Sequence, residues 1–389
     1  MIQYENLINE RVQRVKPSGI RKFFDIAATM DDVLSLSIGE PDFITPWNVR
    51  EAGIDSLVNG HTYYTSNAGM LELRRGICEY YDRNFGVHYP DENHALVTVG
   101  GSEAIDLCIR SLIGPGDEVI IPEPSFVCYA PLTEIVGGVP VGIATKAENE
   151  FRLTAEELRA AITPKTKLLI LPYPGNPTGA VMEKKDLEAI ADVLRDTDIM
   201  VLSDELYAKL TYGGTHVSIA SIEGMWERTV VVNGFSKAFA MTGWRIGYAL
   251  GPVPIIKAMT KLHQFAIMCA PTMAQEAALA ALSEKTDEAV QEMVEEYDAR
   301  RRMLLDRFKK MGLPCFEPKG AFYIFPCIKQ FGMTSEEFCE KFLYEEHVAV
   351  VPGSAFGESG EGFVRISYAK SMADLSKAMD RLERFLSKL

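Results

Sequence analysis

Short apolar runs alternate with amphipathic segments between about residues 45 and 280, and this alternation limits the possible folds more than any other feature. Between two of the runs, apolar residues recur at helical spacing at Ile105, Cys108, Ile109 and Leu112. Continuous apolar strands alternating with helices indicate a mainly parallel sheet covered on both faces. We therefore predict an α/β fold whose large domain has three layers, α/β/α. The runs that we expect to form strands are ALVTVGG, DEVIIPEP, KLLILPYPGN, IMVLSDE and TVVVNGFS.

The C-terminal part has a different texture. A heavily charged segment at about 273–311 predicts one long helix, and an amphipathic helix closes the chain. Shorter strands are expected between these helices, at GAFYIFP, HVAVVPG and GFVRISYA. We predict a large domain over 45–284 and a small α+β domain over 285–389, which the N-terminal segment 1–44 joins.

Composition excludes several classes of function. The formal net charge of −14 argues against nucleic acid or an anionic membrane as the main partner. No apolar stretch approaches the roughly 20 residues that span a bilayer, and the charged start does not resemble a signal peptide. The seven cysteines form no CxxC pair, which favours reduced thiols in a cytoplasm over disulfides or zinc. We expect a cytoplasmic protein without a metal site.

In open α/β sheets, ligands bind beyond the carboxyl ends of the strands, so residues that directly follow the apolar runs are candidates. Gly100, Gly101 and Ser102 follow the first run and open a helix. Glycines allow close approach of a phosphate, and a helix N-terminus offers N–H groups and a positive dipole. Such turns are also common structural features. No GxGxxG or GxxxxGK[ST] accompanies this one, which argues against Rossmann and P-loop nucleotide sites.

Most of the other candidates have an ordinary explanation when each is taken alone. Asn176 precedes a proline and fits a turn. Asp204 and Glu205 end a strand, where a carboxylate is usually solvated or caps a helix, and we assign Glu205 to that class. Lys237 is different because it follows the buried run TVVVNGFS, and burial of an unpaired ammonium is costly.

Considered together, these candidate residues suggest a single binding site. A phosphorylated, charged heterocycle bound covalently to the lysine would use all of them, and pyridoxal 5'-phosphate (PLP) is such a molecule. Desolvation would lower the pKa of the lysine and make it a better nucleophile. The positions supply phosphate donors, a carboxylate, a phenol, an amide and an amine: Gly101, Ser102, Ser236, Arg245, Asp204, Tyr207, Asn176 and Lys237.

The segment SKAFAMTGWRIGY resembles the lysine signature of class I/II PLP-dependent aminotransferases, which have fold type I. The likeness covers nearly the whole chain and is closest to the aspartate and aromatic aminotransferase branch. The other matching segments follow in the order of the family: LSIGEPDF, YYTSNAGMLELR, VTVGGSEAID, PGDEVIIPEPSFVCY, LPYPGNPTG, LSDELY and GFVRIS.

This resemblance implies a role for each matching residue. Lys237 would bond the cofactor and then carry the proton at the substrate Cα, and Asp204 would pair with the ring nitrogen. Asn176 and Tyr207 would bond the ring hydroxyl, and Phe126 would stack on the ring. Arg365 would bind the substrate α-carboxylate with help from Asn176 and the Gly39 backbone. Tyr64 would reach the phosphate of a neighbouring subunit, which implies a homodimer with shared sites.

The implied activity is transfer of an amino group from an L-amino acid to a 2-oxo acid, in a ping-pong cycle between PLP and pyridoxamine phosphate. Some members that act on acidic amino acids carry Lys where this chain has Ser102. Phe126 and the segment GIRKFF suit apolar or aromatic side chains, so we expect aromatic or broad-range substrates. Aspartate aminotransferase is the alternative. A β-lyase is disfavoured because such enzymes tend to carry His at Tyr207, and a regulator's binding domain because Lys237 is present.

Overall fold

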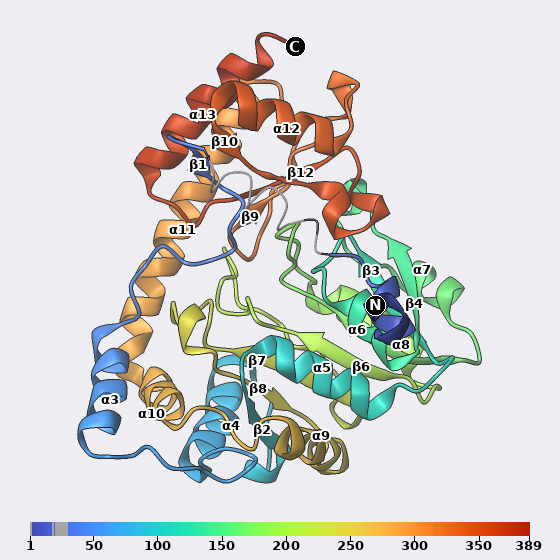
Figure 1. The fold of residues 1–389 in the computed structure, drawn as a ribbon, viewed down its shortest axis with the longest axis vertical. Coiled ribbons are helices and arrows are strands. Elements are labelled where there is room, and N and C mark those ends of the chain that lie inside the picture. The colour runs from blue at the N-terminus through green and yellow to red at the C-terminus, as the bar shows by residue number, and fades with distance from the viewer. Residues whose placement is uncertain (1, 18, 20–29) are drawn as a thin grey trace.

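A seven-stranded sheet forms the centre of the computed structural model, which describes residues 2–17, 19 and 30–389 (Figure 1). The strand order is β2-β8-β7-β6-β5-β3-β4, and β8 runs antiparallel to both of its neighbours while the remaining pairs are parallel. The predicted α/β fold with a mainly parallel sheet is confirmed. The strands are β2 (Ala95–Thr98), β3 (Glu118–Glu123), β4 (Val139–Ala144), β5 (Thr166–Leu171), β6 (Met200–Asp204), β7 (Thr229–Gly234) and β8 (Gly247–Leu250).

Both faces are buried at the inner strands of this sheet, which explains why those strands are apolar without alternation. In β5, Leu168 and Ile170 belong to one apolar cluster, whereas Leu169 and Leu171 belong to another. The first cluster includes side chains of α5 (Gly101–Leu112), α6 (Tyr129–Val136) and α9 (Val253–Ala266). The opposite face is covered by α4 (Leu71–Phe85), α7 (Ala155–Ala161), α8 (Lys184–Leu194) and α10 (Thr272–Ala281).

The C-terminal part contains a three-stranded antiparallel sheet of order β11-β12-β9 and a parallel pair, β1 with β10. Its strands are β1 (Leu34–Ser35), β9 (Tyr323–Ile324), β10 (Val348–Ala349), β11 (Val351–Pro352) and β12 (Val364–Ser367). Helices α12 (Ser335–Glu346) and α13 (Met372–Leu386) lie beside them (Figure 1). No helix in the ranges that the structure describes is both long and apolar enough to cross a membrane.

The prediction of one long helix at about 273–311 is wrong. The structure has two helices there, α10 and α11 (Glu284–Lys310), because Ser283 adopts an extended conformation at ψ 151° in the N-cap position of the second helix. Helix α11 runs from the large sheet to the C-terminal sheets (Figure 1). Its Arg300 Nη1 donates to Asp42 Oδ1 over 2.8 Å and so ties the segment after β1 to this helix.

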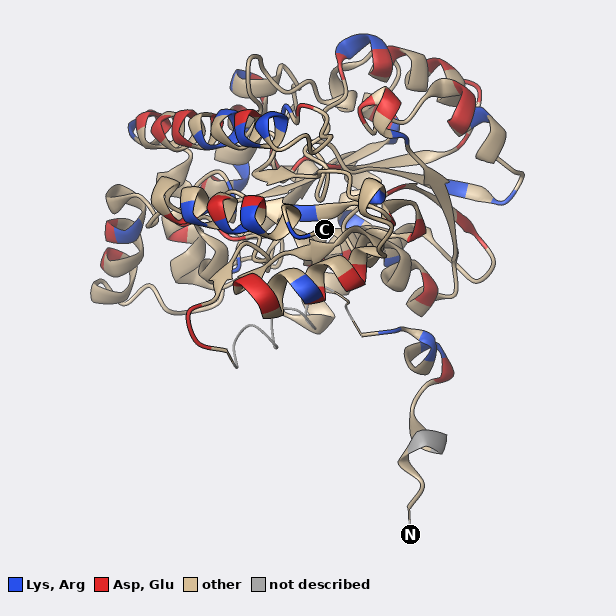
Figure 2. Ribbon diagram, turned by 90° about the horizontal axis from the view of Figure 1, so that it is seen from above, with Lys and Arg blue, Asp and Glu red and all other residues tan. Residues whose placement is uncertain are grey.

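The N-terminal residues project from the rest of the molecule (Figure 2). They include the short helix α1 (Glu10–Arg14), whose Arg11 Nη1 donates to the Ile135 carbonyl of α6. Further along, α3 (Trp47–Val58) packs against α10. The pairing of β1 with β10 joins the N-terminal segment to the C-terminal sheets.

Candidate active site

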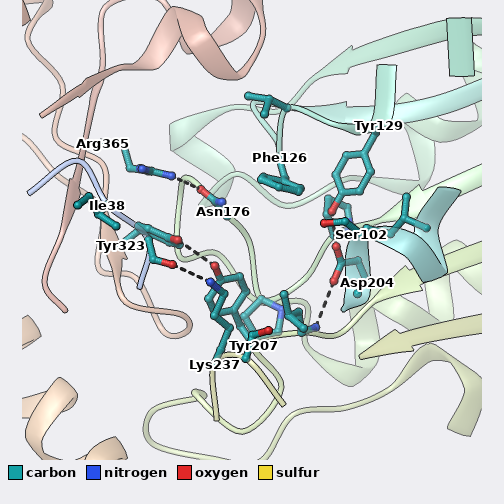
Figure 3. A pocket seen from close by; sticks show the side chains of 18 of the residues that line it. Ile38, Ser102, Phe126, Tyr129, Asn176, Asp204, Tyr207, Lys237, Tyr323 and Arg365 are labelled. Atoms are coloured by element: carbon teal, nitrogen blue, oxygen red, sulfur yellow. Dashed lines mark hydrogen bonds between the residues drawn. The ribbon is translucent and has the colours of Figure 1, made fainter. Parts of the chain in front are cut away.

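A cavity of about 530 Å³ lies where the carboxyl ends of the parallel strands meet the C-terminal sheets (Figure 3). Arg365 and Asn176 lie on one side, Asp204 and Tyr129 lie on the other, and Lys237 and Tyr207 project between them. Eleven of the twelve residues selected from the sequence line this cavity: Gly39, Gly101, Ser102, Phe126, Asn176, Asp204, Tyr207, Ser236, Lys237, Arg245 and Arg365. Tyr64 is the exception, since its side chain is 78% exposed and does not line the cavity.

Lys237 follows β7 and directs its amine into the cavity. Its Nζ donates a hydrogen bond of 2.6 Å to the Gly39 carbonyl and lies 5.9 Å from the centre of the Tyr207 ring. Burial lowers the pKa of the amine to about 8, although the carboxylate of Glu40 acts in the opposite direction. About a tenth of this amine is therefore neutral and nucleophilic at pH 7, far more than for an exposed lysine.

Asp204 ends β6 and is buried opposite the lysine. Tyr129 Oη donates to its Oδ2 over 2.6 Å, and the Leu206 backbone N–H donates to its Oδ1 over 3.2 Å. Burial raises the pKa of this carboxyl group, and the two hydrogen bonds lower it only in part. A cation in the cavity would favour the ionised form, because an opposite charge nearby stabilises a buried carboxylate.

The assignment of Glu205 as a solvated or capping carboxylate is wrong, because its side chain is fully buried at 0% exposure. Ser203 and Ser218 donate to Oε1 over 2.8 Å and 2.6 Å. Tyr81 donates to Oε2 over 3.2 Å, and His216 Nε2 lies 3.1 Å from the same oxygen. The cost of burying this carboxylate is offset by these hydrogen bonds.

Two aromatic residues that sequence reasoning missed support the candidate residues. One is Tyr129, which donates a hydrogen bond to Asp204. The other is Tyr323 of β9, whose hydroxyl lies 2.9 Å from the Tyr207 hydroxyl. A Cβ at position 39 would lie 2.0 Å from Tyr323 Oη, so only glycine fits where the N-terminal segment crosses the cavity. No local signal in the sequence marks either tyrosine, since their partners are 75 and 116 residues away.

Arg365 comes from β12 and is buried at the other end of the cavity. Its Nη1 donates to Asn176 Oδ1 over 2.9 Å, and Nη2 donates to the Ser37 carbonyl. Both partners are neutral, and burial lowers the pKa of the guanidinium. In the part of the chain that the structure describes, Nε is buried without a hydrogen-bond partner. A carboxylate ligand would supply both the missing acceptor and the missing charge.

The first turn of α5 forms the opposite end. Gly100 has φ 79°, and no side chain caps the helix that begins at Gly101. A Cβ at Gly100 would lie 2.8 Å from Arg245 Nη2, which places the guanidinium directly against this turn. With Ser102 and Ser236, which also line the cavity, these groups can hold an anion.

Comparison with known proteins identifies the family. The family described as aminotransferase class I and II matches residues 31–382. An aspartate aminotransferase of Pyrococcus abyssi is 49% identical, over 97% of this chain and 98% of its own. An aromatic-amino-acid aminotransferase 2 of Thermococcus litoralis is 46% identical, over 97% and 98%. The solved structure of an aspartate aminotransferase from Thermus thermophilus with maleate has a TM-score of 0.93 at 39% identity, with 97% of this chain and 99% of that chain covered.

The fold and the family together define an enzyme that transfers amino groups. The chain belongs to the class I and II aminotransferases, a PLP-dependent family of fold type I. The expected aminotransferase activity is therefore confirmed.

Proposed function

We propose that the cavity binds PLP through Lys237 and catalyses transamination of an L-amino acid and a 2-oxo acid. The observation that carries this proposal is a half-buried amine of lowered pKa in one cavity with a buried carboxylate and an uncapped helix N-terminus. The amine can react with the aldehyde of PLP, the carboxylate can pair with its basic ring nitrogen, and the helix N-terminus can bind its phosphate. Asn176 and Tyr207 are assigned to the ring hydroxyl, and Phe126 is assigned to the ring face.

The chain's own residues have distinct tasks in this reaction. When bound, PLP supplies an electron sink for the pair released from the substrate Cα–H bond. Lys237 Nζ would accept the proton from the substrate Cα and deliver it to the carbon of the cofactor that had been its aldehyde carbon, as the lowered pKa of the amine permits. Asp204 holds a proton on the ring nitrogen, and Tyr129 orients that carboxylate.

Arg365 is assigned to the substrate α-carboxylate. Its planar guanidinium can offer two parallel hydrogen bonds to a carboxylate, and its buried Nε adds an unsatisfied donor. Asn176 Oδ1 accepts from Nη1, which fixes the guanidinium and leaves the amide nitrogen as the group able to donate to a ligand. The Tyr323 ring lies 4.5 Å from the guanidinium carbon and supports it from one side.

Aromatic or broad-range amino acids are the proposed donors, and aspartate is the alternative. The cavity wall includes Ile38, Ile105, Phe126 and Leu206, which suit an apolar side chain. The named relatives include both aspartate and aromatic aminotransferases. The segment GIRKFF falls almost wholly on residues 20–29, outside those that the structure describes, so the proposal here rests on the cavity wall.

A panel of amino acids tests this proposal. With the loaded enzyme, we expect kcat/KM for the half-reaction with phenylalanine and tyrosine to exceed that with aspartate by about tenfold or more, since burial of an aromatic side chain is favourable. Stopped-flow absorbance gives these values directly. The reverse order would select the aspartate alternative, and release of ammonia and pyruvate from cysteine conjugates would select a β-lyase.

A homodimer with shared sites is proposed from an exposed apolar patch. The patch consists of Tyr63, Tyr64, Phe265 and Met268, and Phe265 is 84% exposed. Hydrogen bonds from Thr272 to the Tyr63 carbonyl and from Asn67 to the Met268 carbonyl hold its segments together. Large exposed apolar patches mark interaction sites. We take a second copy of the chain as the partner, because the patch includes Tyr64, which the family resemblance assigns to the phosphate of a neighbouring subunit.

Subunit mixing tests whether Tyr64 completes the partner's site. Tyr64→Phe should weaken PLP binding about tenfold by loss of a charge-assisted hydrogen bond, and Lys237→Ala should be inactive. In a heterodimer, action across the interface leaves one site intact and puts both lesions in the other. We therefore expect activity at limiting PLP to rise on mixing, toward about one quarter of the wild-type sites for random exchange of subunits.

The control for this experiment is a mixture of Lys237→Ala with wild type, whose activity should not change on subunit exchange because every site with Lys237 keeps an intact Tyr64; exchange itself is verified with subunits that carry different tags. Absence of recovery despite verified exchange would show that Tyr64 does not act in the neighbouring site.

Two further assignments belong to the proposal. We place the large domain at 45–284 and the small domain at 285–389 together with 1–44, supported by the pairing of β1 with β10. A cytoplasmic location is proposed because all seven cysteines are free thiols.

A further inference from the structure

Glu103 lies at the third position of α5, beside the turn that is proposed to hold the phosphate. Its Oε2 accepts a hydrogen bond from the backbone N–H of Val99, the residue before the N-cap glycine. In an ordinary capping box, a glutamate at this position bonds the N-cap residue itself. Here the bond falls one residue earlier, at the entrance of the turn, and no side chain of Gly100 competes for the N–H groups of the helix.

His263 of α9 contacts the other carboxylate oxygen of Glu103. Its Nδ1 lies 2.7 Å from Glu103 Oε1, and its side chain is fully buried at 0% exposure. Within the described ranges, Nε2 is buried without a hydrogen-bond partner. With a proton on Nδ1, the imidazole can donate a hydrogen bond to Glu103 Oε1.

The turn itself has little freedom to adjust. Thr98 Oγ1 donates to the Gly100 carbonyl over 2.9 Å. A Cβ at Gly247 of β8 would lie 2.6 Å from both Gly100 C and Gly101 N, so the two backbones are in close contact. The Glu103 bond to Val99 fixes the remaining end, and the N–H groups at the start of α5 are thereby aimed into the cavity.

The geometry points to Glu103 and His263 as positioning residues that set the phosphate-binding turn. This inference rests on the proposed PLP site and adds two residues that do not line the cavity. A carboxylate is otherwise an unfavourable neighbour for a phosphate, since like charges repel. Its presence beside the turn is explained by the backbone hydrogen bond that it accepts.

Comparison of two aldehydes separates phosphate positioning from general stability. The unloaded chain is titrated with PLP and with pyridoxal, which lacks the phosphate, and binding is followed by fluorescence quenching. We expect Glu103→Ala to lower the ratio of PLP affinity to pyridoxal affinity about tenfold or more, because the turn loses a hydrogen bond to a charged group. Glu103→Gln should stay within about threefold of wild type, since its amide oxygen can still accept from Val99.

Two other variants complete the test. His263→Leu keeps apolar packing but cannot donate to Glu103, and it should lower the ratio by about threefold or more. Arg110→Ala is the matched control, because it removes the 2.7 Å pair with Asp106 on the same helix without touching the turn, and should leave the ratio unchanged.

Two outcomes would overturn the inference. An unchanged ratio in both Glu103→Ala and His263→Leu would do so, and so would an equal loss in Glu103→Gln and Glu103→Ala. An unchanged ratio that accompanies an equal fall in both affinities would show that the two residues have a structural role only. Failure of the wild-type chain to bind either aldehyde would instead overturn the proposed function.

Discussion

Lys237→Ala should slow the half-reaction by at least about 10⁴-fold, because one amine both bonds the cofactor and moves the proton at the substrate Cα. The geometry behind this expectation is an amine directed into the cavity and 2.6 Å from the Gly39 carbonyl. Single-turnover absorbance measures the rate. Borohydride reduction of the loaded wild-type enzyme, followed by peptide mapping, should label Lys237 alone, and a label on Lys257 or Lys261 would refute the assignment.

Lys209 is the matched control for this substitution. It is also a partly buried lysine whose pKa is lowered by burial, but its Nζ donates to Asn84 Oδ1 and lies outside the cavity. Lys209→Ala should therefore leave the half-reaction within about threefold of wild type, as for residues remote from the chemistry. A loss as large as that of Lys237→Ala would indicate that removal of a buried lysine disturbs the fold, and the effect at Lys237 could then not be assigned to the reaction.

The lowered pKa of Lys237 gives the same prediction a pH signature. Because the amine has a pKa of about 8, its neutral form increases as the pH rises toward 8. The rate at which the unloaded chain captures PLP should rise with pH and level off above about pH 9, whereas an exposed lysine would continue to gain neutral form past about pH 10. A rate that still climbs at pH 10 would contradict the burial effect.

The sequence was sufficient to predict those parts of the fold whose causes are local. Strands β5, β6 and β7 are buried on both faces, so each appears as a continuous apolar run. Strand β8 was missed because it is only four residues long and begins with glycine. The break between α10 and α11 was missed because neither Gly nor Pro marks it, and Ser283 alone ends the periodic pattern.

The site was predictable where a residue follows a strand and unpredictable where its role depends on a distant partner. Asp204 and Lys237 follow apolar runs, and in parallel strands such positions meet at one edge. Glu205 also follows a run, but its hydrogen bond from Tyr81 spans 124 residues. Glu103 pairs with His263 across 160 residues. Short-range patterns contain no information about contacts of this kind.

Asp204→Ala should slow the half-reaction by about 10³-fold, the effect expected when a charged group that stabilises the transition state is removed. PLP should still bind, because the lysine and the phosphate-binding turn are unchanged. The expected effect is electronic. Burial raises the pKa of the Asp204 carboxyl group, so its ionised form is stabilised strongly when it pairs with a protonated ring nitrogen, and that pairing keeps the proton on the ring. Single-turnover rates, with cofactor content determined by absorbance, separate the two effects.

Glu205→Gln is the matched control, since it neutralises the adjacent buried carboxylate, whose partners are Ser203, Ser218 and Tyr81 and not the cavity. It should lower the free energy of unfolding by about 1–3 kcal/mol, as expected for a buried hydrogen-bonded group left imperfectly paired. Its half-reaction rate should remain within about fivefold of wild type, because Asp204 keeps its bond from Tyr129. The two variants therefore separate the effect of the Asp204 carboxylate, which is assigned to the ring nitrogen, from that of the neighbouring Glu205 carboxylate. An Asp204→Ala enzyme with a nearly unchanged single-turnover rate, or a Glu205→Gln enzyme equally slow, would show that Asp204 has no special electronic role.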